Sequence, residues 1–130
     1  MLKKYKFSIF LLFLLFCFLL FNITGCASED TVGQQTARGL MEADENNDIF
    51  LLKWAVYKKV RIVEAEEFNA VETKEIGSIS KEYRKNNVFE IGMASVLPKG
   101  TKLYQSIEEP EYVYANVKGV YTLYKSIPEG

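Results

Sequence analysis

Apolar and polar positions divide the chain into three parts of different character. Residues 7–21 read FSIFLLFLLFCFLLF, an almost unbroken apolar run without charge. Residues 26–48 are polar and acidic and hold few large apolar side chains. Residues 49–130 mix apolar, aromatic and charged positions in short runs, a pattern typical of a small folded domain. The pattern therefore predicts divisions at 1–25, 26–48 and 49–130.

The first part has the order of a secretory signal peptide. Three lysines, Lys3, Lys4 and Lys6, precede the apolar run, and the small residues Thr24 and Gly25 follow it. A basic start, an apolar centre and a small-residue end together direct secretion and cleavage. We expect cleavage after residue 25.

An uncleaved membrane span is the alternative for this part. Residues 7–23 make 17 positions, at the short limit of what crosses a bilayer as a helix. The small residues that end the run favour cleavage over retention.

The end of the apolar run resembles a lipobox, the processing signal of bacterial lipoproteins. Ile23 stands at the aliphatic position, Thr24 and Gly25 at the two small positions, and Cys26 at the obligatory cysteine. The resemblance implies that a diacylglycerol, with palmitate-type chains, is attached to the Cys26 thiol and that cleavage falls between Gly25 and Cys26. Two acyl chains give a stable membrane anchor, whereas one gives marginal binding.

A disulfide is the alternative role for Cys26. Its one possible partner in the chain is Cys17, which lies in the apolar run and is lost on cleavage. The mature chain would then hold a single cysteine in an oxidising compartment, and lipidation accounts for it.

The second part, residues 26–48, predicts a flexible acidic tether. It holds six acidic residues against Arg38 alone, and such a composition buries too little surface to offset its ordering entropy. A coil of this length reaches about 25 Å on average.

The third part predicts a mostly β domain, a small antiparallel sheet or barrel-like fold that becomes α+β with one short helix. Residues 49–57 and 60–63 are dense in strand-forming residues, and residues 64–69 suit a loop or a helical turn. A single helix over 49–67 is an alternative, because Leu52, Val56, Val60 and Val63 also fit helical spacing.

The C-terminal region gives the clearest local prediction. Residues 112–117 and 120–127 flank Lys118 and Gly119, a two-residue gap that suits a tight hairpin. This hairpin sets Val117 opposite Val120.

The composition argues against a reaction and against nucleic acid. The chain has no histidine, the commonest general base and metal ligand, so we expect no enzyme, metal or cofactor. Residues 49–130 carry 12 basic and 11 acidic side chains without a basic stripe, which excludes a typical nucleic-acid surface. The acidic clusters at 64–67 and 108–111 lack calcium-loop spacing and indicate solvated loops.

Tyrosines crowd the C-terminal strands and suggest a ligand surface. An exposed row of them could stack on sugars or hold a protein, although tyrosines also suit half-buried strands. The candidate residues are Tyr104, Tyr112, Tyr114 and Tyr121.

A longer pattern resembles small, uncharacterised lipoproteins of Bacillus-type Gram-positive bacteria. It comprises Ile76-Gly77, Asn87-Val88-Phe89, the turn and strand LPKGTKLY at 97–104, and the closing Tyr121, Tyr124, Glu129 and Gly130. The resemblance implies a shared β-rich domain and names no functional residues. We expect a lipid-anchored protein on the extracytoplasmic face of the cell membrane that makes non-catalytic contacts with an envelope protein. The alternative is a module that binds a glycan or another cell-wall ligand through its tyrosines.

Overall fold

The computed structural model describes residues 2–20 and 30–128. Its helices are α1 (Leu2–Leu20), α2 (Val32–Ala43) and α3 (Ala65–Ala70). Its strands are β1 (Ile49–Leu52), β2 (Ala55–Val63), β3 (Thr73–Ser78), β4 (Lys81–Glu82), β5 (Met93–Ala94), β6 (Lys102–Ser106), β7 (Tyr112–Val117) and β8 (Val120–Ser126). No described helix is both long and apolar enough to cross a membrane.

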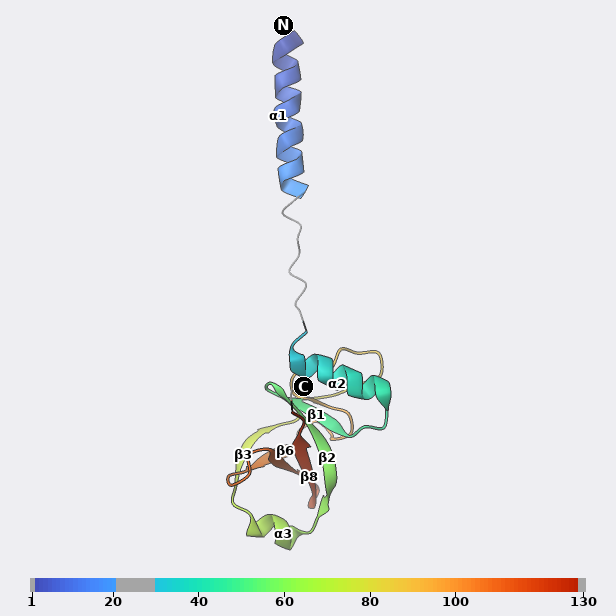
Figure 1. Ribbon diagram of the computed structural model, residues 1–130, viewed down its shortest axis with the longest axis vertical. Coiled ribbons are helices and arrows are strands. Elements are labelled where there is room, and N and C mark those ends of the chain that lie inside the picture. The colour runs from blue at the N-terminus through green and yellow to red at the C-terminus, as the bar shows by residue number, and fades with distance from the viewer. Residues whose placement is uncertain (1, 21–29, 129–130) are drawn as a thin grey trace.

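The strands form one curled sheet in the order β3-β6-β7-β8-β2-β1-β5-β4, antiparallel except between β4 and β5. Register shifts at Lys59/Arg61 in β2 and at Glu75/Gly77 in β3 are bulges, which increase local twist and help the sheet to curl. The result is a half-barrel with α2 across one end and α3 at the other (Figure 1). The predicted fold class, a small antiparallel, barrel-like sheet that becomes α+β with one short helix, is confirmed, and α2 is a second helix beyond that prediction.

Strand β1 is buried on both faces, which explains its continuous apolar sequence. Ile49 and Leu51 belong to the core cluster beneath α2, whereas Phe50 points into the half-barrel. The Phe50 ring stacks on Tyr57 at 4.9 Å and meets Tyr124 edge-on at 5.0 Å between centroids. A strand that contacts two layers gives no alternation of polar and apolar positions.

A tight turn at Lys53 and Trp54 joins β1 to β2 and pairs Leu52 with Ala55. Lys53 has φ of +54°, a left-handed conformation that lets the chain reverse here. Residues 49–67 therefore form two strands and the start of α3, and the alternative of one helix is wrong.

The predicted flexible tether is wrong for residues 32–43, which form α2. The helix begins with a capping box: Gln34 N donates to Thr31 Oγ1 at 3.2 Å, and Thr31 N donates to Gln34 Oε1 at 2.9 Å. Gly33 and Ala37 are buried, and Leu40 packs against the core cluster that contains β1. The segment is acidic overall, but its apolar residues lie on one face of the helix. Burial of that face offsets the conformational entropy lost on ordering the helix.

The predicted C-terminal hairpin is confirmed in its register. Strands β7 and β8 pair Val117 with Val120 and Ala115 with Thr122. Both residues of the connecting turn have positive φ, 50° and 83°, as a two-residue hairpin turn requires.

A buried tyrosine ties the start of β1 to the sheet. The Tyr124 hydroxyl donates to Asp48 Oδ1 at 2.7 Å, and the Tyr124 side chain is completely buried. Burial raises the pKa of Asp48 above its ordinary value, although the bond from Tyr124 and the charge of Lys59 lower it in part. Burial of the charged Asp48 carboxylate therefore destabilises the folded state, because the carboxylate loses part of its hydration.

Replacing Asp48 by asparagine should leave stability at neutral pH unchanged or increase it. The amide oxygen still accepts from Tyr124, and no charge is desolvated. Because the folded-state pKa of Asp48 is raised, its contribution to stability is full below the unfolded pKa and is lost as pH rises through the folded pKa. Urea unfolding should show D48N gaining stability relative to the native protein as the pH rises above about 3.9, the ordinary pKa of an aspartate.

Tyr124→Phe is the matched control for this prediction. It leaves the Asp48 carboxylate without its donor and should cost about 1–3 kcal/mol at neutral pH. A loss in D48N that grows with rising pH would contradict the account of Asp48.

Candidate functional site

The predicted lipid-attachment residue Cys26 and the predicted cleavage position at Gly25 lie outside the described residues. Their roles stay predictions. The described domain begins at Asp30, four residues beyond Cys26.

The structure brings the four candidate tyrosines together around α3. Tyr114 is buried, with 6% exposure, and Tyr104, Tyr112 and Tyr121 are half-buried in the same core cluster. Burial raises the pKa of the Tyr114 hydroxyl. The cluster is thus one core layer at the α3 end of the half-barrel.

Phe68 of α3 occupies the faces and edges that a ligand would need. Its ring stacks on Tyr121 at 4.2 Å and meets Tyr104 and Tyr114 edge-on at 5.6 and 5.4 Å between centroids. Lys125 Nζ lies over the remaining ring, that of Tyr112, at 5.4 Å. Glycan binding by these tyrosines stays a prediction. The contacts of their rings within the domain do not support it.

One member of the acidic cluster at residues 64–67 is paired within the domain. Arg61 donates to both carboxylate oxygens of Glu67, and these bonds hold the pKa of Glu67 below its ordinary value. In the described part of the chain, no three His, Cys, Asp or Glu side chains lie together as metal ligands would. Glu67 therefore helps to position α3.

Replacing Phe68 by alanine should destabilise the domain by about 2 kcal/mol. A half-buried phenylalanine forfeits less than the 3–5 kcal/mol of a fully buried one, but three ring contacts are lost as well. Thermal unfolding checks this, with Phe68→Leu as a control that keeps most of the apolar volume. An F68A protein as stable as the native one would show that Phe68 does not stabilise the tyrosine cluster. The tyrosine rings would then again be candidates for ligand binding.

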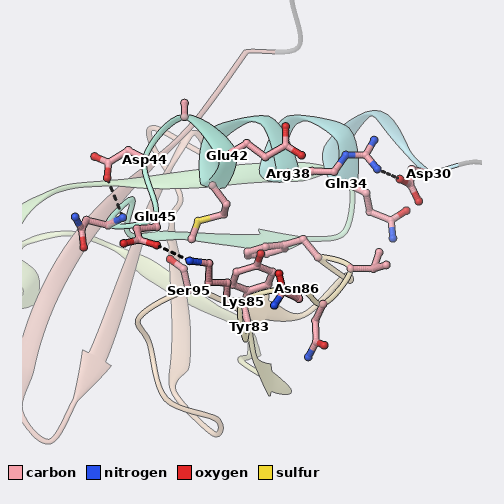
Figure 2. Close-up of a pocket in the computed structure, with 16 residues that line it drawn as sticks. Asp30, Gln34, Arg38, Glu42, Asp44, Glu45, Tyr83, Lys85, Asn86 and Ser95 are labelled. Carbon is pink, nitrogen blue, oxygen red and sulfur yellow. Dashed lines mark hydrogen bonds and ion pairs between the residues drawn. The ribbon is translucent and has the colours of Figure 1, made fainter.

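A second candidate site, unforeseen from the sequence, is an open cleft of about 960 Å³ beside α2. It lies between α2 with the loop that follows it and residues 83–89 (Figure 2). Met41, Tyr83 and Phe89 form its apolar base, and the Tyr83 and Phe89 rings stack at 4.9 Å. Segments some 40 residues apart in sequence thus build its two walls.

The rim of the cleft is charged and polar. Lys85 Nζ lies 3.5 Å from Glu45 Oε2, and both side chains point toward each other between the two walls (Figure 2). Both are well exposed, so their attraction is weak and a ligand can displace it at little cost. Arg38 pairs with Asp30 at 2.8 Å at the far end.

Hydrogen bonds fix the loop between α2 and β1 on one side of the cleft. Asn47 Nδ2 donates to the Leu40 carbonyl at 2.8 Å, and the Ser95 hydroxyl donates to the Asn47 carbonyl at 2.6 Å. The Ser95 oxygen also accepts from Ile49 N at 2.9 Å. This wall of the cleft is therefore preformed.

The cleft has the chemistry of a binding surface. Ser95 lines it, but among the described residues its hydroxyl bonds only to backbone groups, so no side chain activates it as a nucleophile. The other polar lining groups are amides, carboxylates, the Tyr83 phenol and two paired cations. They can hydrogen-bond to a ligand and orient it.

Comparisons with models of protein families, with curated proteins and with solved structures find no match.

Proposed function

We propose that this protein is a lipid-anchored interaction module on the extracytoplasmic face of the cell membrane, without catalytic activity. The observation that carries the proposal is the order of residues 1–26, a basic start and an apolar run that ends in Ile23, Thr24, Gly25 and Cys26. A signal peptide sends the chain across the membrane, and a diacylglycerol on Cys26 holds it there.

The cleft beside α2 is the surface that engages the partner. It combines an apolar base with charges of both signs and with four amide side chains, Gln34, Asn46, Asn86 and Asn87. Amides and mixed charges suit the backbone and side chains of a polypeptide segment. A sugar platform needs free ring faces, and the buried Phe89 covers one face of the half-buried Tyr83 ring. We therefore favour an envelope protein over a glycan as the partner.

Site-specific photo-crosslinking on intact cells tests this proposal. A photoreactive amino acid at Asn87, an exposed cleft residue, is expected to give a discrete adduct with an envelope protein. The same amino acid at Lys74, an exposed residue of β3 outside the cleft, is the control and should give none. No adduct at Asn87, or the same adduct at both positions, would overturn the assignment, and a glycan adduct would favour the alternative ligand.

A further inference from the structure

Trp54 is the most exposed large apolar side chain among residues 30–128, with 73% of its surface in contact with solvent. It stands in the β1–β2 turn beside Lys53, and both residues line a small hollow of about 100 Å³. Half-buried Leu52 and Ile76 help to line this hollow. An indole that projects from an apolar base marks a contact surface.

The turn that carries Trp54 has a sequence that folding alone does not favour. Lys53 holds φ of +54°, where glycine or asparagine costs less. The next position then exposes the single tryptophan of the chain to water. A strained turn residue next to an exposed indole suggests that the turn has a partner outside the domain.

The β1–β2 turn lies against the first turn of α2, close to where the described part of the domain begins. A Cβ atom at Gly33, in the first turn of α2, would lie 2.8 Å from the Trp54 carbonyl oxygen, so these backbones are in direct contact. Figure 1 shows the β1–β2 turn beside the start of α2. Val32, the first residue of α2, is also half exposed. Four Cα–Cα steps separate Cys26 from Asp30, which span at most about 15 Å.

We propose that Trp54 and Lys53 contact the lipid surface that carries the anchor. This inference rests on the proposed lipid attachment at Cys26, which keeps the start of α2 close to the headgroups. Tryptophan favours the membrane–water interface, and a lysine beside it is attracted to anionic headgroups. Asp30, at the start of the described domain, is paired with Arg38 at 2.8 Å, which offsets its negative charge in part. The turn then orients the domain, with α3 pointing away from the membrane.

Fluorescence of the single tryptophan tests the contact. The lipidated protein is reconstituted into vesicles of phosphatidylcholine and phosphatidylglycerol, with or without brominated phosphatidylcholine as a quencher in the membrane. The emission of Trp54 is expected to move to shorter wavelength, to be quenched by the brominated lipid and to be shielded from iodide in solution. Mass spectrometry of the same sample reports separately whether Cys26 carries the diacylglycerol.

The double variant W54F/V120W is the matched control. Val120 begins β8 and is half exposed. Its neighbour Tyr121 pairs with Val63, at the end of β2 opposite the β1–β2 turn and about 25 Å from it along the strand. The tryptophan of this variant should be quenched by iodide and not by the brominated lipid. A lipidated protein in which Trp54 behaves like this control would overturn the inference alone, and so would equal lipid quenching at both positions. A protein without lipid on Cys26 would overturn the proposed function and this inference with it.

Discussion

Replacing Cys26 by serine should stop maturation completely and leave an unprocessed precursor in the membrane fraction. In bacterial lipoproteins, which residues 23–26 resemble, a thioether to diacylglycerol precedes cleavage, and a hydroxyl cannot form that thioether. The lipid-modified form should therefore disappear, and the chain should keep residues 1–25. Immunoblotting of membrane fractions, together with metabolic labelling by a palmitate analogue, measures both effects.

Cys17→Ser is the matched control, because it changes the other cysteine of the chain within the apolar run. This variant should be cleaved and labelled like the native protein. Normal processing of C26S, or an equal block in C17S, would contradict the assignment of Cys26 as the lipid attachment site.

Replacing Gly33 by alanine should lower the free energy of unfolding by about 1–2 kcal/mol, although alanine is the better helix former. A Cβ at this position would lie 2.8 Å from Leu51 Cδ1 and 2.8 Å from the Trp54 carbonyl oxygen. The leucine side chain can move, but the carbonyl belongs to the backbone of the β1–β2 turn. Either α2 or the turn has to shift, and the packing of α2 on β1 is lost in part.

Gly39 provides the control for this substitution within the same helix. A Cβ there meets nothing within 4 Å, so G39A should gain about 0.5–1 kcal/mol from helix propensity alone. Urea unfolding of the two variants should therefore give changes of opposite sign. A gain in both would show that α2 does not depend on close contact with the turn.

The strands near the C-terminus were predictable because local chemistry decides them. Lys118 and Gly119 separate two runs of strand-forming residues, and both adopt the positive φ that such a gap requires. The register of β7 with β8 then follows from the chain itself. The strand assignment of residues 49–52 rests on the same enrichment in apolar and strand-forming residues.

The acidic composition of residues 26–48, taken as a whole, hides the helix α2. Its position can be read from Thr31 and Gln34, which form the capping box, and from Ala37 and Leu40 on one face. The turn at Lys53 and Trp54 has neither glycine nor asparagine, so its sequence gives no signal for a reversal.

The cleft could not be predicted from the sequence. Its walls come from residues 30–46 and 83–95, and no local pattern relates Glu45 to Lys85 or Met41 to Tyr83. The tyrosines show the opposite case, since their crowding was visible but Phe68 as their cover was not. Whether a row of aromatic residues on strands is core or binding surface depends on which side chains pack above it.

Mass spectrometry of the mature N-terminus from purified membranes tests the proposed lipid anchor most directly. The predicted result is a chain that begins at Cys26 and carries a diacylglycerol on its thiol. A mature protein with an unmodified Cys26, or one that retains Met1, would contradict the account.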